Sequence, residues 1–474
     1  MDFTRLKKQD FVLTFLIFVL SLIGTSIIFS VTYNTIDNSL LIKQLILLTL
    51  GFCLYFVVMI TDINWFKITS IQILMYIFII SSLLYVNLFG SSIAGTNRWI
   101  DFGFFSFQPS EYSKILVLLF ISLVFSNEFV SIRDKLKKER RAIEGNLMNF
   151  SFRDKVIRFL SDKDTKGTFL SLIYVAPIAF LTFIQPSLGN TLIIMLLTGL
   201  AIFFSISKQK IILKSFIIFS TIFLALKELV IFDNSSNLFL INNGTNKIIQ
   251  IIVLILLSIG LARLFKIKII NLSLIFLTVI IAIFGFVFSW NNIFTDYQKT
   301  RIITFISGPE SDPLGSGFQI IQSKIAIGSG QLLGRGYLQG TQSNLHILTQ
   351  SHTDFAFASM SEQFGFIGSI LVLLIFLALI LRITHISKTV KSSFGRNFCL
   401  GTASLLLIHV FINIGMNIGR LPVTGIPLPL VSYGGSSVFM TLIILGLVQS
   451  IYVSRRPVDM ADSLMITSLR SKKR

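Results

Sequence analysis

The sequence predicts an all-α polytopic integral membrane protein with about 10–12 transmembrane helices, and three observations support this class. Apolar residues make up 53% of the 474 residues and charged residues only 13%, and the mean hydropathy is +0.80. The apolar residues gather in long runs, as expected when a bilayer core about 30 Å thick requires roughly 20 apolar residues per helix. Basic residues concentrate in alternate connections between these runs, which is the charge bias of helical membrane proteins.

About twelve apolar runs follow one another along the chain. They span roughly residues 11–31, 40–60, 69–89, 112–127, 169–185, 188–206, 211–232, 248–265, 271–290, 355–382, 397–417 and 433–453. The first run follows a short basic start and lacks a small-residue cleavage site, so we expect a retained span rather than a signal peptide. An even number of spans puts both termini on one side, and the positive-inside bias makes that side the cytoplasm.

Three connections differ from the short turns elsewhere in a single transmembrane domain covering residues 1–474. We expect a basic cytoplasmic loop at 127–168, a large external loop at 291–354 before the tenth apolar run, and a basic cytoplasmic tail at 454–474. The net charge of +19 would by itself suit nucleic-acid binding. Because the basic residues lie mainly in the cytoplasmic connections, we expect no nucleic-acid partner.

The external segment from Arg301 to Gly368 has the most unusual chemistry of the chain. It is long, polar and rich in glycine, and loops of this length are usually functional or disordered. It ends near Asp354, where a carboxylate benefits from the field at a helix N-terminus, so a capping and a functional role are both consistent with this position. Glu362 lies further along among apolar neighbours, and a buried ionisable group needs a partner. We therefore expect these carboxylates to form a charged cavity that opens outward.

A second external segment, 95–114, also carries charged residues. Ser110 is expected to cap the fourth span. Glu111 and Lys114 then lie three residues apart on one helical face, either as a surface pair or as a functional pair at a membrane entry. The external cations that suit a phosphate-containing substrate are Arg98, Arg301, Lys324 and Arg335. No cysteine or histidine cluster has the spacing of a metal site.

A third external segment, 420–437, is dense in glycine and proline. Non-helical backbone near a membrane needs hydrogen-bond partners or water, because unpaired amides are costly in lipid. This composition suits re-entrant backbone that lines a cavity, with a tight external turn as the alternative.

The chain resembles the SEDS family of polytopic membrane proteins over most of its length. The motifs that carry the resemblance are GTNRWIDFGFFSFQPSEYSK at 95–114, QPSLGNTL at 185–192, YQKTRIITF at 297–305, DPLGSGFQIIQSKIAIGSGQLLGRGYLQGTQSNL at 312–345, SHTDFAF at 351–357 and GMNIGRLPVTGIPLPLVSYGGSS at 415–437. Within the family, the GTQSNL element is more similar to the cell-elongation branch than to the division branch.

The resemblance implies a peptidoglycan glycosyltransferase that polymerises lipid II at the outer face of the bacterial cytoplasmic (inner) membrane during elongation and shape maintenance. It also implies a class B penicillin-binding protein and other elongation-complex membrane proteins as partners. The alternatives are a lipid II flippase or transporter without chemistry, a scaffold, and a division-specific polymerase. Transport would place ionisable groups near the bilayer midplane, whereas the polar residues here cluster toward the external face.

The resemblance places the family's essential aspartate on Asp354, which we expect to act as the general base. The residues expected to bind the substrate are Arg98, Glu111, Lys114, Arg301, Lys324, Thr353 and Glu362. A divalent cation, Mg or Mn, is expected to assist some of them at the diphosphate.

The chain departs from the family pattern at several places. Ser187 stands where the family usually has Asp, and Gln363 stands where a second Glu is usual. Two extra apolar runs, 211–232 and 248–265, come as a pair and so preserve the external side of Asp354. The 127–168 loop resembles a further insertion.

Overall fold

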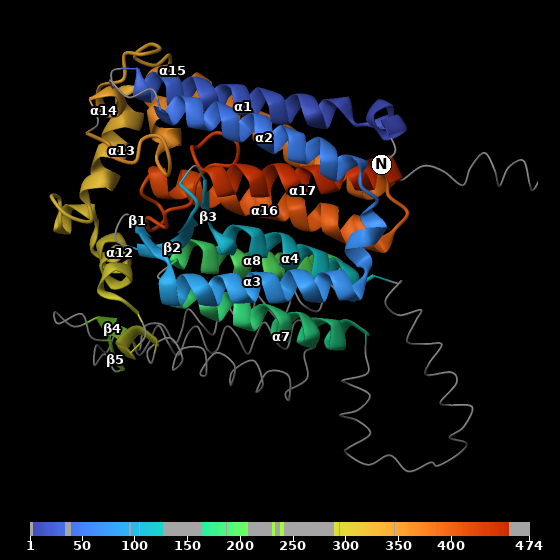
Figure 1. Cartoon of the computed structure of the whole chain (residues 1–474). Coiled ribbons are helices and arrows are strands. Elements are labelled where there is room, and N and C mark those ends of the chain that lie inside the picture. The colour runs from blue at the N-terminus through green and yellow to red at the C-terminus, as the bar shows by residue number, and fades with distance from the viewer. Residues whose placement is uncertain are drawn as a thin grey trace, which may run out of the picture. The chain divides into compact units, whose positions relative to one another are not determined.

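The structure is a computed structural model that describes residues 3–33, 39–93, 96–103, 105–126, 163–185, 187–206, 230–232, 238–240, 289–292, 294–345 and 347–454. The chain divides into two compact units. The first comprises Met1–Ser205 and Thr304–Arg474, and the second comprises Ile206–Ile303. The first unit is a bundle of long helices (Figure 1).

The first half of the bundle contains η1 Phe3–Lys8, α1 Phe11–Thr32, α2 Ser39–Ile60, η2 Ile63–Lys67, α3 Thr69–Phe89, the strands β1 Ser91–Ile93, β2 Thr96–Asp101 and β3 Ser106–Phe107, α4 Pro109–Val124, α7 Lys163–Ile184 and α8 Leu188–Ser205. The second half contains η3 Pro309–Ser311, α13 Phe318–Ser329, α14 Thr341–Asn344, α15 Ala356–Thr389, α16 Ser393–Asn417 and α17 Gly435–Ser454. The strands β1, β2 and β3 form a small antiparallel sheet. In the second unit, β4 Val230–Phe232 and β5 Leu238–Leu240 form an antiparallel hairpin, and α12 Asp296–Ser307 leads from this unit into the first.

The prediction of an all-α polytopic membrane protein is confirmed. Eight of the described helices are long and apolar enough to cross a membrane: α1, α2, α3, α7, α8, α15, α16 and α17. The 16-residue α4 corresponds to the predicted fourth span. The runs 211–232, 248–265 and 271–290 lie almost wholly outside the described residues, although the end of the first belongs to strand β4.

One predicted boundary needs correction, and two predicted segments lie largely beyond the described part of the chain. The helix α7 begins at Lys163, so the loop predicted for 127–168 ends earlier than its apolar pattern indicated, because the polar first turn continues the helix. The rest of that loop and nearly all of the 454–474 tail fall outside the described residues.

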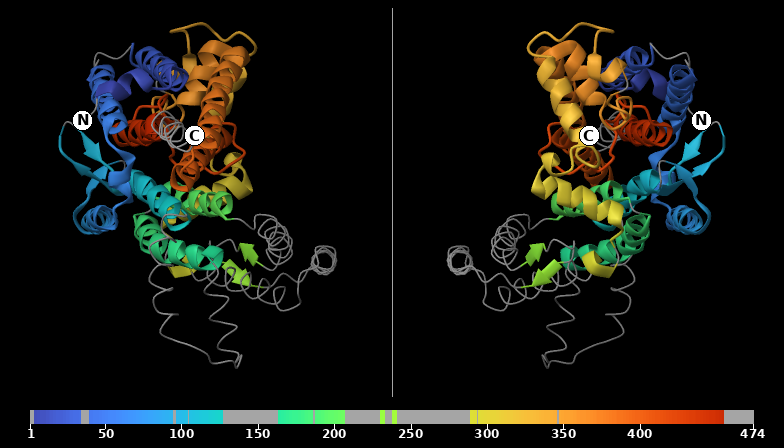
Figure 2. Two further views of the ribbon diagram at one scale, coloured as in Figure 1. Left: turned by 90° about the vertical axis from the view of Figure 1, so that its right-hand side faces the viewer. Right: turned by 90° about the vertical axis from the view of Figure 1, so that its left-hand side faces the viewer.

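The central helices of the bundle are α16 and α17, which are mostly buried, whereas α1, α2, α3 and α15 each expose one side. The end-on views in Figure 2 show α17, in red, between its neighbours. It packs against α2, where glycines allow the two helices to approach closely. A Cβ atom at Gly51 would lie 2.5 Å from a methyl carbon of Leu442, and one at Gly446 would lie 2.9 Å from the carbonyl oxygen of Tyr55. Small residues at such crossings are typical of membrane helices.

One end of the bundle is closed by polar contacts around the chain's N-terminal residues. Arg5 donates to the carbonyl oxygens of Ile60 and Thr61. Asp10 accepts a hydrogen bond from the amide of Leu13, which caps α1, and forms a 2.7 Å salt bridge with Arg382 on α15. These contacts join α1, the end of α2 and α15 at this end.

The three polar segments singled out in the sequence lie together at the opposite end, where Figure 1 shows β1, β2, α13 and α14. The N-terminal end of α17 contacts the first of them, because the Ser436 hydroxyl accepts from the amide of Gln108 and donates to the carbonyl oxygen of Ser106. Elements at both ends of the sequence therefore build this end of the bundle.

The segment 419–434 is buried backbone rather than an external turn. Ile426, Leu428 and Leu430 are each 1% exposed although the segment is not helical. A Cβ atom at Gly24 on α1 would lie 2.5 Å from the carbonyl oxygen of Leu430, so only glycine allows this approach. Buried, non-helical backbone of this kind is what the prediction of a re-entrant segment requires.

Candidate functional site

Asp354 is held at the start of α15 through its main chain. The N-cap of α15 is Phe355, so Asp354 is not the capping residue that its position suggested. Its carbonyl oxygen accepts hydrogen bonds from the side-chain amides of Asn413 (3.0 Å) and Asn417 (3.1 Å), which are buried one turn apart on α16. The half-buried residue Thr353 directs its hydroxyl to the side chain of Gln350 at 2.7 Å.

Asn417 connects Asp354 to α13, which carries Lys324. Its side-chain oxygen accepts from the amide of Ala358, and its carbonyl oxygen accepts from the hydroxyl of Ser323 at 2.8 Å. The exposed Lys324 follows Ser323 and lies over Gly419, where a Cβ atom would come 2.3 Å from the lysine Cε. The structure thus brings Lys324 and Asp354 to the same end of α16, as expected for residues of one site.

Sequence reasoning missed Asn413 and Asn417. The available signal was the spacing of two amides at the end of an apolar helix: Asn417 lies in the GMNIGR motif, and Asn413 lies four residues before it. That spacing puts both on one helical face. Only the structure shows that this face meets the backbone of Asp354.

Glu362 anchors α14. Its side chain is 0% exposed and accepts hydrogen bonds from the amides of Thr341, Gln342 and Ser343 and from the hydroxyls of Thr341 and Ser343, at 2.7–3.1 Å. A carboxylate at a helix N-terminus stabilises the unpaired amides and the helix dipole. Both carboxylate oxygens are used in these bonds, so the geometry favours a structural role over the expected substrate contact.

We expect Glu362→Gln to loosen α14. A glutamine keeps one oxygen but turns an amide toward donors, and an unsatisfied buried donor costs about 1–3 kcal/mol. Hydrogen exchange at the amides of Thr341 to Ser343 should therefore accelerate by roughly 10-fold or more. The matched control is Glu310→Gln in the same polar segment, where the side chain is exposed. Unchanged protection in Glu362→Gln would contradict the anchoring role.

Glu111 and Lys114 form the predicted pair, but inside the bundle. Lys114 Nζ lies 2.8 Å from Glu111 Oε1, and the two side chains are 0% and 3% exposed, so the alternative of a surface pair is wrong. The expected cap at Ser110 is also wrong, because α4 begins at Pro109 with Gln108 as its N-cap. Proline suits the first position of a helix, and the Ser110 hydroxyl instead accepts from Asn190 on α8.

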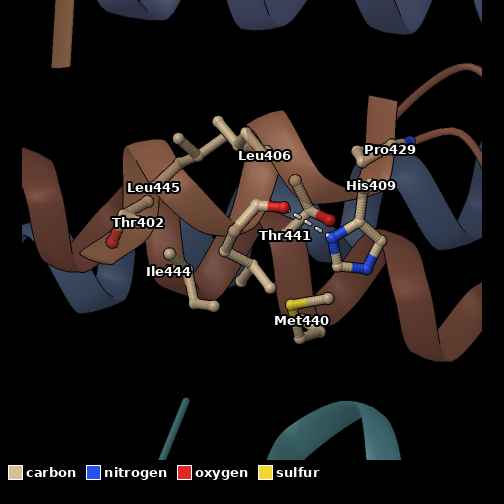
Figure 3. A pocket seen from close by; sticks show the side chains of 9 residues that line it. Thr402, Leu406, His409, Pro429, Met440, Thr441, Ile444 and Leu445 are labelled. Atoms are coloured by element: carbon tan, nitrogen blue, oxygen red, sulfur yellow. Dashed lines mark hydrogen bonds between the residues drawn. The ribbon is translucent and has the colours of Figure 1, made fainter. Parts of the chain in front are cut away.

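His409 on α16 completes this buried cluster. Its Nδ1 lies 2.8 Å from the carbonyl oxygen of Leu405, which can only accept, so Nδ1 carries the proton. Nε2 is then free to accept from Lys114 Nζ at 3.2 Å. Figure 3 shows His409 at the edge of a small, largely apolar cavity between α16 and α17. The cavity is lined by Thr402, Leu405, Leu406, His409, Pro429, Met440, Thr441, Ile444 and Leu445.

The other three predicted cations occupy different parts of the chain, and the exposed Arg335 donates to the hydroxyl of Thr341 at 2.7 Å. Arg98 on β2 is buried, and its Nε donates to the carbonyl oxygen of Gln185 just after α7. Gln185 in turn donates to the carbonyl oxygen of Leu83 on α3, so Arg98 joins the β-sheet to the end of α7 and, through Gln185, to α3. Arg301 lies on α12, in the part of that helix that belongs to the second unit.

The turn before α13 is held by a charged carboxylate. Asp312 accepts hydrogen bonds from the amide and hydroxyl of Ser316 and from the amide of Gly315. These bonds to the ionised form hold the pKa of Asp312 below its usual range. Close to neutral pH this carboxylate is therefore ionised, and it fixes the entry to the helix that carries Lys324.

The comparison with known proteins identifies the family. A model of the FTSW_RODA_SPOVE family, described as cell cycle proteins, matches residues 7–243 and 238–457. The chain belongs to this family.

Similar proteins cover most of the chain. Peptidoglycan glycosyltransferase MrdB of Escherichia coli (strain K12) is 32% identical over 81% of this chain and 78% of its own length. Peptidoglycan glycosyltransferase RodA of Treponema pallidum (strain Nichols) is 30% identical over 93% of this chain and 97% of its own. A solved structure described as coordinating polymerization and crosslinking in a peptidoglycan synthase complex has the same fold, with a TM-score of 0.57 and 24% identity over 94% of this chain and 98% of that one.

The two departures from the family pattern have defined places in the fold. Ser187 is buried directly before α8, and its carbonyl oxygen accepts from Thr191. The side-chain oxygen of Gln363 accepts from the hydroxyl of Ser30 on α1 at 2.5 Å and from the amide of Leu338 at 3.2 Å. A neutral glutamine at this position links α15 to α1 without burying a second charge beside Glu362.

Proposed function

We propose that this protein is a peptidoglycan glycosyltransferase that polymerises lipid II during cell elongation and shape maintenance. The observation that carries the proposal is the similarity, over most of both chains, to two relatives named as peptidoglycan glycosyltransferases. The site geometry supports it, because an aspartate and a lysine occupy the same end of α16 among segments from distant parts of the chain.

The proposed reaction joins an acceptor hydroxyl to the anomeric carbon of a lipid-linked sugar. The new C–O bond forms as the bond from the anomeric carbon to the diphosphate breaks, and undecaprenyl diphosphate leaves with the bonding electrons. Asp354 takes the proton of the attacking hydroxyl as general base. Lys324 stabilises the charge that develops on the departing diphosphate.

The orientation follows from the distribution of charge. We propose that the end closed by Arg5, Asp10 and Arg382 faces the cytoplasm, with both termini, and that the end bearing Asp354 faces outward in the bacterial cytoplasmic membrane. A site at that end reaches a substrate whose sugars lie outside and whose lipid remains in the bilayer.

The described part of the chain contains no preformed set of side chains for a metal ion. No group of three or more His, Cys, Asp or Glu side chains there is arranged to hold one, and the carboxylate of Glu362 is already used by α14. A Mg or Mn ion would depend on substrate phosphates and at most Asp354, a mode that Mg²⁺ accepts.

We propose a class B penicillin-binding protein as the partner, with other membrane proteins of the elongation complex. The support is the solved complex of the same fold, described as coordinating polymerization and crosslinking.

The proposal is tested by supplying fluorescent lipid II to the purified protein, with and without this partner, and resolving the products by gel electrophoresis. Glycan strands longer than the substrate are expected. Transfer of lipid II across liposomes without any polymer would replace the proposal by a flippase, for which the buried Glu111–Lys114 pair is the favouring observation. Loss of polymer with EDTA, restored by Mg or Mn, would establish the cation; loss of rod shape on depletion would favour elongation over division.

We expect Asn417→Ala to lower the polymerisation rate by about 10- to 100-fold, because small displacements of a catalytic group carry penalties of this size. The substitution removes one of the two amides on the Asp354 carbonyl and the acceptor for the amide of Ala358. The loss should appear in kcat more than in KM, and the thermal midpoint should fall only modestly.

The control is Asn397→Ala, the same change at a buried position near the other end of α16. It should leave the rate within a few-fold of wild type. Equal losses of rate in the two variants would assign the effect of Asn417→Ala to general weakening of α16.

A further inference from the structure

The helix α15 is broken near one end, and a non-helical segment fills the break. Gly365 has φ 65° and ψ −162°, so the backbone groups around it lack their helical partners. The amide of Phe366 donates to the carbonyl oxygen of Gln331 at 2.8 Å. The amide of Arg335 donates to the carbonyl oxygen of Glu362 at 3.0 Å. Two further backbone hydrogen bonds join the two segments, from the amide of Ile367 to the carbonyl oxygen of Leu332 and from the amide of Gly336 to the carbonyl oxygen of Gln363.

Glycines allow this close contact between two backbones. A Cβ atom at Gly334 would lie 2.1 Å from the carbonyl oxygen of Gln363, and one at Gly365 would lie 2.3 Å from the amide nitrogen of Gly334. The segment 331–336 is therefore fixed to α15 by its main chain, which leaves its side chains free to face outward.

Two of those side chains are apolar and strongly exposed. Leu332 is 66% exposed and Leu333 is 78% exposed. Their neighbours across the break, Phe366 and Ile367, are 57% and 56% exposed. The apolar surface then continues along the outward side of α15 at Ile370, Leu371, Leu374, Leu377 and Leu381. That helix is a candidate membrane span, so the leucines of the segment extend a lipid-facing surface.

Two physical requirements are met together here. Removing a leucine side chain from water contributes about 1.5–3 kcal/mol, so two adjacent exposed leucines favour an apolar environment. Lipid admits backbone only where its polar groups are paired, and the break in α15 supplies those partners. Arg335 and Tyr337 follow the leucines, and both residue types suit the level of lipid headgroups.

We propose that residues 331–337 form an interfacial loop whose Leu332 and Leu333 lie among the acyl chains of the bilayer leaflet beside the start of α15. The occupant of this apolar surface is lipid, because the surface is continuous with the exposed side of a membrane span. The loop holds the neighbouring α14 at the membrane surface. Glu362 in turn binds the amides of α14. This inference concerns membrane contact and does not depend on the proposed activity.

The test uses single nitroxide labels in reconstituted liposomes of phosphatidylglycerol and phosphatidylethanolamine, with Cys53 and Cys399 replaced by alanine. Cysteines are introduced separately as Leu333→Cys, Leu374→Cys and Leu314→Cys. Leu374 is 57% exposed on the lipid-facing side of α15, and Leu314 is 90% exposed in the loop before α13. Accessibility to oxygen and to a water-soluble nickel chelate is measured by power saturation.

Labels at Leu333 and Leu374 are expected to share a high ratio of oxygen to nickel accessibility, several-fold above the ratio at Leu314. A ratio at Leu333 equal to that at Leu314 in the purified protein would overturn the proposal and leave the surface to a protein partner in the aqueous phase. A label at Leu332 provides a second reading. All labelled positions are exposed, so unchanged thermal midpoints are expected and confirm that each variant is folded.

Discussion

Asp354→Asn is expected to lower the rate of lipid II polymerisation by about 10²- to 10⁴-fold, the contribution typical of general acid–base catalysis. Asparagine matches the size of aspartate but cannot accept the proton of the attacking hydroxyl. The fold should survive, because the contacts from Asn413 and Asn417 reach the main-chain carbonyl oxygen, which the substitution retains. The initial rate of glycan formation and the thermal midpoint together check both parts of this expectation.

The control for this variant is Asp101→Asn, the same change at an exposed carboxylate at the end of β2, where it accepts from the amide of Gly103. It should weaken a local turn and leave the rate within a few-fold of wild type. Should Asp354→Asn polymerise lipid II as fast as the unchanged protein, Asp354 would not be the base. A low rate accompanied by a large drop in thermal midpoint would instead mean that the carboxylate has a structural role.

Lys114→Met is expected to destabilise the protein by about 3–5 kcal/mol, the usual cost of breaking a buried ion pair. The change leaves the Glu111 carboxylate buried without its cation, and it removes the donor to His409 Nε2. The other carboxylate oxygen of Glu111 already lacks a hydrogen-bond partner within the described part of the chain. Thermal unfolding in detergent should therefore shift clearly downward.

Two further variants separate the charge effect from the loss of a side chain. Lys388→Met makes the same change at an exposed position at the end of α15 and should shift the thermal midpoint little. The double variant Lys114→Met with Glu111→Gln removes both charges and should recover part of the lost stability. Equal midpoints for Lys114→Met and Lys388→Met would mean that the buried pair contributes no net stability.

The sequence predicted the elements that follow local rules. The membrane helices are visible because a bilayer demands long apolar runs, and most predicted runs correspond to described helices. The pairing of Glu111 with Lys114 follows from a spacing of three residues on one helix. Asp354 was singled out by its position before an apolar run and by the motif around it.

Other features escaped because their causes lie far away along the chain. Ser110 has the chemistry of a helix cap, yet Pro109 starts the helix. The Ser110 hydroxyl instead accepts a hydrogen bond from Asn190 on another helix. Glu362 was expected beside Asp354 in a charged cavity, but its carboxylate binds amides about twenty residues earlier in the sequence. Neither partner can be read from periodicity, because hydrogen bonds between separate elements depend on how those elements pack.

The sequence by itself therefore determined the class of protein and the positions of most spans, and it predicted Asp354 as a site residue, since hydrophobic length and short-range spacing are properties of the chain. The tertiary structure alone decided that Asn413 and Asn417 hold Asp354, that His409 joins the Glu111–Lys114 pair, and that residues 331–336 fill the break in α15. These contacts join residues that are tens to hundreds of positions apart. They form because buried polar groups must find partners, and the packing of the helices determines which partners are within reach.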